Sequence, residues 1–131
     1  MVYATCSGEG RTMCKGIGLD LCEIARMEKR LEDDRFLQRY FTDTEIGYIR
    51  SKGRGAAQTM AGIFAAKEAL SKALGTGIVF DLREITVSHD ELGKPVYELT
   101  GKACEAGGGD KFWLSITHEG GMAAAVCIRE G

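Results

Sequence analysis

Three charged residues interrupt segments that otherwise look apolar. Asp20 follows a short run in which apolar and small residues alternate, and Glu68 and Lys72 stand four residues apart in a long Ala-rich segment. Carboxylate oxygens suit hard cations such as Mg²⁺, which takes one or two protein carboxylates and completes its shell with water and phosphate oxygens. If Asp20 and Glu68 met in space they could hold such an ion. Lys72, one helical turn from Glu68, could then pair with a phosphate on it.

Each of these residues also has an ordinary structural interpretation. A Glu followed four residues later by a Lys is a common solvent-facing pair on helices. A carboxylate at a strand end or turn, such as Asp20, often accepts hydrogen bonds from backbone N–H groups. Spacing alone therefore leaves two hypotheses open, a metal and phosphate site or a set of structural charges.

Other candidate residues are weaker. Gly75 and Gly77 allow close approach of the backbone to a ligand, although Gly in this position also ends helices. His118, at the end of an alternating stretch, could bind a phosphate, transfer a proton or serve the structure, and it is the only one of the two histidines placed to matter. The five cysteines include no Cys-x-x-Cys pair, so we expect free thiols in a reducing compartment and not a zinc site.

Periodic patterns predict the elements that must position these residues. Residues 16–21 alternate as in a strand, and residues 24–41 show helical spacing. A capping box at Thr42 and Glu45 opens a short helix, and the longest helix is predicted over 56–74, ending at Gly75. The second half predicts a hairpin of 85–87 with 96–99, a helix over 101–106, and strands over 112–118 and 122–128.

This order of elements predicts an α+β class, a small single domain with helices packed on an antiparallel sheet. A chain of 131 residues, with 27% charged and 44% hydrophobic residues, suits one globular domain. The net charge of −2 lacks the basic excess of a sequence-independent nucleic-acid binder. No apolar run reaches the ~20 residues that cross a bilayer. We therefore expect a cytoplasmic protein that binds neither nucleic acid nor membrane, with a polar leader at 1–15 and the domain at 16–131.

Four stretches, taken together and in order, resemble the holo-[acyl-carrier-protein] synthase family of 4′-phosphopantetheinyl transferases. They are GIGLD at 16–20, FAAKEALSKALGTGI at 64–78, GKP at 93–95 and SITH at 115–118. The resemblance implies a homotrimer of small α+β subunits that binds coenzyme A in clefts between neighbours. It also implies a Mg²⁺-dependent reaction, in which 4′-phosphopantetheine passes from coenzyme A to a serine of apo acyl carrier protein and adenosine 3′,5′-bisphosphate is released.

The same resemblance implies a role for each matching residue. It assigns Mg²⁺ to Asp20 and Glu68, which form the catalytic set together with Lys72, and we prefer Glu68 as the base for the serine hydroxyl. It implies that the coenzyme is bound by Lys72, Gly75, Gly77, Gly93, Lys94, Pro95 and His118.

The expected carrier-protein contacts are basic. Arg26 matches the family position that faces the acidic carrier protein, with Lys29 and Arg30 beside it. Residues 24–54 hold eight Lys and Arg against six Asp and Glu, which fits either a solvated mixed-charge surface or a docking face for an acidic partner. One position departs from the family, because Ile63 stands where an arginine is usual, so a coenzyme phosphate contact is either missing or supplied by Arg54 or another cation.

Two other functions remain open. A Mg²⁺-dependent phosphohydrolase would use Asp20, Glu68 and Lys72 with water in place of the serine hydroxyl. A catalytically silent trimeric module that binds coenzyme A would retain the fold without turnover.

Overall fold

The computed structural model describes residues 13–131; the first twelve residues of the predicted leader lie outside the described part. The sheet strands are β1 (Cys14–Glu23), β4 (Lys111–Glu119) and β5 (Met122–Glu130), and the hairpin strands are β2 (Ile85–His89) and β3 (Pro95–Leu99). The helices are α1 (Ile24–Glu28), α2 (Asp34–Tyr40), α3 (Asp43–Arg50), α4 (Ala56–Leu74) and α5 (Gly101–Gly107), with short 3₁₀ turns η1 (Gly53–Gly55) and η2 (Leu82–Glu84). None of the described helices is both long and apolar enough to span a bilayer.

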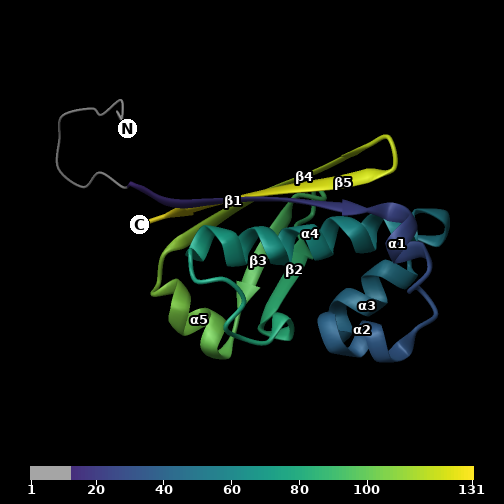
Figure 1. Ribbon diagram of the computed structural model, residues 1–131, viewed down its shortest axis with the longest axis horizontal. Coiled ribbons are helices and arrows are strands. Elements are labelled where there is room, and N and C mark those ends of the chain that lie inside the picture. The colour runs from purple at the N-terminus through teal and green to yellow at the C-terminus, as the bar shows by residue number, and fades with distance from the viewer. Residues whose placement is uncertain (1–12) are drawn as a thin grey trace.

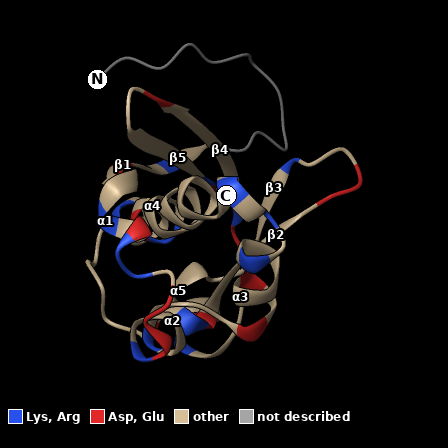
Figure 2. Cartoon of the chain, turned by 90° about the vertical axis from the view of Figure 1, so that its right-hand side faces the viewer, with Lys and Arg blue, Asp and Glu red and all other residues tan. Residues whose placement is uncertain are grey.

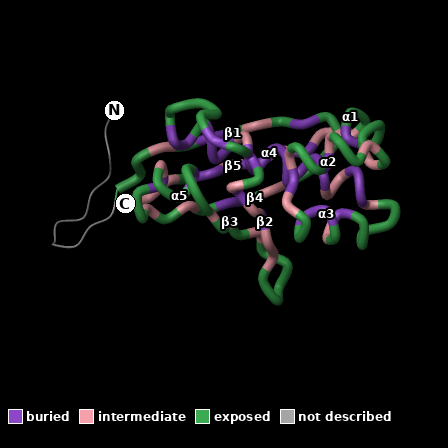
Figure 3. Tube along the Cα trace, turned by 90° about the horizontal axis from the view of Figure 1, so that it is seen from below, coloured by how far each residue is buried: buried purple, intermediate pink, exposed green. Residues whose placement is uncertain are grey.

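The long helix α4 lies between two layers (Figure 1). One layer is an antiparallel sheet in the order β1-β5-β4, and the other contains the β2-β3 hairpin, α2, α3 and α5. Since both sides of α4 are covered, its buried residues run almost all round the helix, as expected of an apolar helix in a core. Figure 3 shows this burial along α4 and the exposed turn that joins β2 to β3. The predicted α+β class, with helices on an antiparallel sheet, is confirmed.

Two glycines of β1 allow α4 to pack directly on the strand backbone. A Cβ at Gly16 would overlap the carbonyl oxygen of Ala73, and one at Gly18 would overlap that of Ala69. Ala69 and Ala73 are themselves buried, one turn apart on α4. This close contact brings the strand residue Asp20 within reach of the helix.

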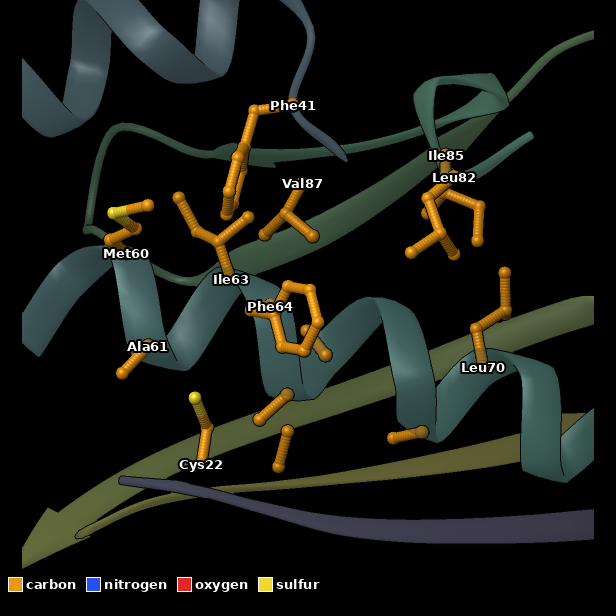
Figure 4. Packing of buried hydrophobic residues seen from close by; sticks show 14 of the residues in the cluster. Cys22, Phe41, Met60, Ala61, Ile63, Phe64, Leu70, Leu82, Ile85 and Val87 are labelled. Carbon is orange, nitrogen blue, oxygen red and sulfur yellow. The ribbon is translucent and has the colours of Figure 1, made fainter. Parts of the chain in front are cut away.

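The other side of α4 faces the main apolar core. Figure 4 shows Ile63 of α4 directed toward Phe41 and Val87, and Leu70 directed toward Leu82. All five side chains are at least nine-tenths buried. The core therefore joins α4 to η2, to β2 and to the segment that follows α2.

The sheet carries an apolar stripe on the face turned away from α4. Ile17, Leu19 and Leu21 of β1 are each more than 60% exposed, while Gly18 and Cys22, which alternate with them, are buried. The register places Val126 beside Leu19 and Ile128 beside Ile17, so the stripe continues on β5. The predicted alternation is confirmed, but the apolar side chains lie on the outside.

The predicted elements are confirmed, with one range divided in two. The predicted capping box is present, since Thr42 Oγ1 accepts from Glu45 N (3.3 Å) and Glu45 Oε1 accepts from Thr42 N (2.9 Å). Gly75 ends α4 in the left-handed region at φ 77°. The helical spacing over 24–41 corresponds to two helices, α1 and α2, because Asp33 accepts from Phe36 N (3.1 Å) and starts a new helix there.

Candidate functional site

Asp20 and Lys72 meet across the contact between β1 and α4. Lys72 Nζ lies 3.1 Å from Asp20 Oδ1 and donates a second hydrogen bond to the carbonyl oxygen of Leu19 (2.9 Å). The Asp20 side chain is 18% exposed and that of Lys72 is 55% exposed. The carboxylate is therefore held at the edge of the sheet, and part of the lysine remains open to solvent.

Glu68 lies beside this pair, one turn before Lys72 on α4. Partial burial raises the pKa of its carboxyl group, and the negative charge of Asp20 raises that pKa further, against the lowering effects of Lys72 and Arg26. The influence of Asp20 on Glu68 means that the two carboxylates share one local field. The structure thus brings together the three residues predicted to form the catalytic set.

The donor set fits a hard divalent cation. Two clustered carboxylates offer the oxygen ligands that Mg²⁺ prefers, and an ion between them would relieve the repulsion by Asp20 that raises the pKa of Glu68. Within residues 13–131, no group of three or more His, Cys, Asp or Glu side chains gathers to form a cage made of protein alone. An ion at Asp20 and Glu68 would therefore complete its coordination with water or substrate oxygens.

A cleft of about 550 Å³ opens next to Glu68. Arg26 and Arg39 lie at this cleft, each with its guanidinium 5.3 Å from an aromatic ring centroid, Arg26 over Phe64 and Arg39 over Tyr40. The remaining lining residues are Ile78, Phe80, Asp81 and Leu82. We name this space the arginine cleft, and it combines apolar walls with two cations.

A second pocket, of about 180 Å³, collects several of the residues predicted to bind the coenzyme. Gly93, Pro95 and His118 line it together with Gln58, whose amide nitrogen donates to His118 Nε2 at 2.8 Å. We name it the histidine pocket, because the two histidines of the chain both line it.

His89 and Tyr48 were missed by sequence reasoning. The His89 ring stacks on the Tyr48 ring with centroids 4.2 Å apart. Lys52 Nζ lies 4.4 Å from the centroid of the Tyr48 ring. Burial lowers the pKa of His89, and the charge of Lys52 lowers it further. The available signal was the position of His89 between the two predicted hairpin strands, four residues before the GKP stretch at 93–95.

The arginine cleft, which contains Glu68, and the histidine pocket, which contains His118, lie on opposite sides of α4. An α-helix turns by about 100° per residue, so Thr59 in the histidine pocket and Glu68 in the arginine cleft, nine residues apart, point about 180° apart. The two pockets share no lining residue.

The other residues predicted to bind the coenzyme or the carrier protein lie outside both pockets. Gly75 and Gly77 adopt positive φ in the exposed segment after Lys72. Lys94 reaches over the Trp113 ring, 5.3 Å from its centroid. Lys29 and Arg30 are exposed just after α1, where Arg30 pairs with Asp33 at 3.0 Å. Arg54 is exposed on η1, whereas Ile63 is buried and lines the histidine pocket.

Comparison with known proteins identifies the family. Residues 16–127 match the model of the 4′-phosphopantetheinyl transferase superfamily. The chain belongs to this superfamily. A holo-[acyl-carrier-protein] synthase of Treponema denticola is 47% identical over 123 residues, which cover 91% of this chain and 100% of the relative.

Solved structures of this family of transferases agree with the fold. A holo-(acyl-carrier-protein) synthase from Bacillus anthracis, in complex with CoA (3′,5′-ADP), is 37% identical with a TM-score of 0.77, over 91% of this chain and 98% of that one. The Helicobacter pylori holo-[acyl-carrier-protein] synthase in complex with coenzyme A is 32% identical with a TM-score of 0.75, over 86% and 98%. The resemblance found in the four sequence stretches is thereby confirmed.

Proposed function

We propose that this transferase is a Mg²⁺-dependent holo-[acyl-carrier-protein] synthase, which moves 4′-phosphopantetheine from coenzyme A to a serine of apo acyl carrier protein. The observation that carries the proposal is the meeting of Asp20, Glu68 and Lys72 at one edge of the sheet, in a chain nearly half identical to a synthase of that name. Coenzyme A in the related Bacillus anthracis and Helicobacter pylori structures supports the choice of donor.

Each residue of the catalytic set has a distinct task. Asp20 and Glu68 would hold Mg²⁺, which supplies neutralisation of pyrophosphate charge. Lys72, which is partly open to solvent, would bind a pyrophosphate oxygen and keep the β-phosphorus in place. The Glu68 carboxylate would accept the serine hydroxyl proton. The serine oxygen then bonds to the β-phosphorus as the anhydride bond breaks, and adenosine 3′,5′-bisphosphate leaves.

The coenzyme site would be completed by a neighbouring subunit. The histidine pocket, with Gly93, Pro95 and His118, lies on the side of α4 opposite Glu68, so one coenzyme molecule would contact the two groups on different copies of the chain. The exposed stripe of Ile17, Leu19 and Leu21 supports such an assembly, because large exposed apolar patches mark interaction surfaces. We propose a homotrimer.

The carrier protein would dock at the arginine cleft. Arg26 and Arg39 line the cleft, Lys29 and Arg30 are exposed in the segment between α1 and α2, and Arg35 is exposed on α2. Figure 2 shows Lys and Arg along α1 and α2. A cationic rim of this kind steers an acidic partner and fixes its register. Glu68 in the same cleft would then face the incoming serine.

Intact mass spectrometry tests the proposed function. The protein is incubated with coenzyme A, Mg²⁺ and a panel of apo carrier proteins. We expect one carrier protein to gain the mass of a single phosphopantetheine group, with adenosine 3′,5′-bisphosphate as the second product. Free phosphopantetheine with an unmodified carrier would instead indicate a phosphohydrolase. Binding of coenzyme A without any turnover would indicate a silent binding module.

A further inference from the structure

A buried ion pair lies next to the arginine cleft and has no part in the chemistry above. Lys67 Nζ is 2.5 Å from Glu45 Oε1, and both side chains are completely buried. Lys67 directly precedes Glu68, but its side chain leaves α4 about 100° further round the axis and enters the core. There it reaches α3, which carries Glu45.

Every proton of the Lys67 ammonium group has an acceptor. Besides Glu45, Nζ donates to the carbonyl oxygen of Tyr40 (2.8 Å) and to that of Leu82 (3.1 Å). Glu45 in turn accepts from the backbone N–H of Thr42 (2.9 Å) and of Val87 (2.8 Å). The pair thus fixes four backbone positions relative to α4.

Two of these positions belong to the arginine cleft. Tyr40 ends α2 and Leu82 begins η2, and both residues line the cleft. They are 42 residues apart in the chain and no hydrogen bond joins them directly within the described residues, so the ammonium group of Lys67 bridges two walls of the cleft.

Stability alone gives a weak reason for this arrangement. Burying two charges costs free energy of desolvation that their attraction only partly offsets, and apolar residues of similar size often serve as well or better. A geometric role accounts for the pair more directly, because a buried and fully satisfied network specifies one arrangement of the groups it joins.

We infer that Lys67, with Glu45 as its counter-ion, is a positioning residue that sets the separation of the Tyr40 and Leu82 walls and thereby the fit of the carrier protein in the arginine cleft. The inference rests on the proposed function. Lys67 acts through Tyr40 and Leu82 and touches neither the coenzyme nor the reacting atoms.

The test compares Lys67→Met with Met60→Ala. Both positions lie on α4 and are fully buried, but Met60 lines neither pocket. Misplacing binding groups by about 1 Å can cost a hundredfold, so we expect Lys67→Met to raise the KM for carrier protein by about tenfold or more and to change the KM for coenzyme A by less than about twofold. Met60→Ala should lower the melting temperature and leave the KM for carrier protein unchanged.

A double variant separates fit from stability. Lys67→Met leaves Glu45 buried without a counter-ion, which by itself destabilises the fold. Adding Glu45→Gln removes that charge but keeps only one of the two oxygens that accept from Thr42 N and Val87 N. The melting temperature should therefore recover in part, while the KM for carrier protein stays high because the carbonyls of Tyr40 and Leu82 still lack their shared donor. If the KM recovers together with the melting temperature, or if Lys67→Met behaves like Met60→Ala, the inference is wrong. The wild-type protein serves as the separate check, because its failure to modify any carrier would contradict the proposed function instead.

Discussion

The chemistry proposed here depends on two carboxylates that lie close together at one edge of the sheet. The two carboxylates of Asp20 and Glu68 share one local field with Lys72 and Arg26, and Lys72 makes its ion pair with Asp20. The Glu68 carboxylate accepts no side-chain or backbone hydrogen bond within residues 13–131, and the residue is partly buried. A partly buried carboxylate that is repelled by Asp20 would be stabilised by a bound cation.

Neutral variants of the carboxylates test this arrangement. Asp20→Asn and Glu68→Gln should each lower turnover by at least about two orders of magnitude, the scale of losing one electrostatic contributor to a transition state. Without metal, Glu68→Gln should melt at a higher temperature than wild type, since it relieves repulsion by Asp20. Mg²⁺ should raise the melting temperature of wild type and not of Glu68→Gln.

A surface carboxylate provides the control for these variants. Glu98→Gln, on an exposed position of β3, should leave turnover and the effect of Mg²⁺ unchanged. If either site variant keeps a turnover near that of wild type at saturating Mg²⁺, the carboxylate that it replaces does not hold the metal and has only a structural role.

At the scale of elements, the close packing of β1 on α4 is what unites the site. Gly16 and Gly18 let the helix backbone lie against the strand, and Asp20 follows two residues later on the same side. A wider spacing between strand and helix would separate Asp20 Oδ1 from Lys72 Nζ.

Alanine at Gly18 tests the need for this contact. A Cβ there would overlap the Ala69 carbonyl oxygen and lie 2.9 Å from the amide nitrogen of Ala73. We expect Gly18→Ala to reduce the free energy of unfolding by about 3 kcal/mol, the upper range of overpacking effects, and to reduce turnover as well. Gly47→Ala, on α3 with open space around it, should instead stabilise the fold by up to about 1 kcal/mol. Urea denaturation measures both changes, and equal effects would contradict the account.

The strand ends are joined by Asp110, and this junction depends on pH. Asp110 pairs with Arg129 of β5 (2.7 Å) and Lys15 of β1 (3.1 Å), and these hydrogen bonds lower the pKa of its carboxyl group. When folding lowers the pKa of a carboxyl group, the resulting stabilisation is present at pH values above the pKa of the unfolded chain, about 3.9. This stabilisation is lost as the pH falls through the lower pKa of the folded state. At pH 7 the melting temperature of wild type should therefore be higher than that of Asp110→Asn. This difference in melting temperature should shrink below pH ~4. A constant difference across this range would contradict the assignment.

At the scale of the whole molecule, local sequence patterns predicted where helices and strands lie. They did not predict which faces of those elements would be buried. Three short-range signals are confirmed. They are the capping box at Thr42, the end of α4 at Gly75, and the alternation of Ile17, Leu19 and Leu21. Alternation gives a strand two faces but does not say which one is covered, because that depends on where α4 packs. The resemblance supplied Asp20, Glu68 and Lys72 as one set, whereas the placement of His89 beside His118 depends on how the hairpin folds back.

The exposed stripe predicts assembly. Leu19→Glu would place a charge in the centre of the stripe, where Leu19 is 62% exposed in the isolated chain. We expect light scattering to show a trimer for wild type and a smaller species for Leu19→Glu, with turnover lost although no residue of the catalytic set has changed. Lys102→Glu serves as the control, because Lys102 is an exposed residue of α5 and lies outside the stripe. This variant should stay trimeric. A fully active monomer would contradict the shared-site proposal.

Mixing two inactive variants tests the central claim most directly. Glu68→Gln disables the arginine-cleft side of each subunit and His118→Ala disables the histidine-pocket side, so each variant alone should transfer little phosphopantetheine to carrier protein. If every site takes Glu68 from one subunit and His118 from its neighbour, then trimers reassembled from both variants contain some sites with both residues intact. Intact mass analysis should then show phosphopantetheine transfer well above the sum of the separate variants. Mixed trimers that are no more active than that sum would mean that Glu68 and His118 serve the reaction within a single subunit or that His118 does not serve it.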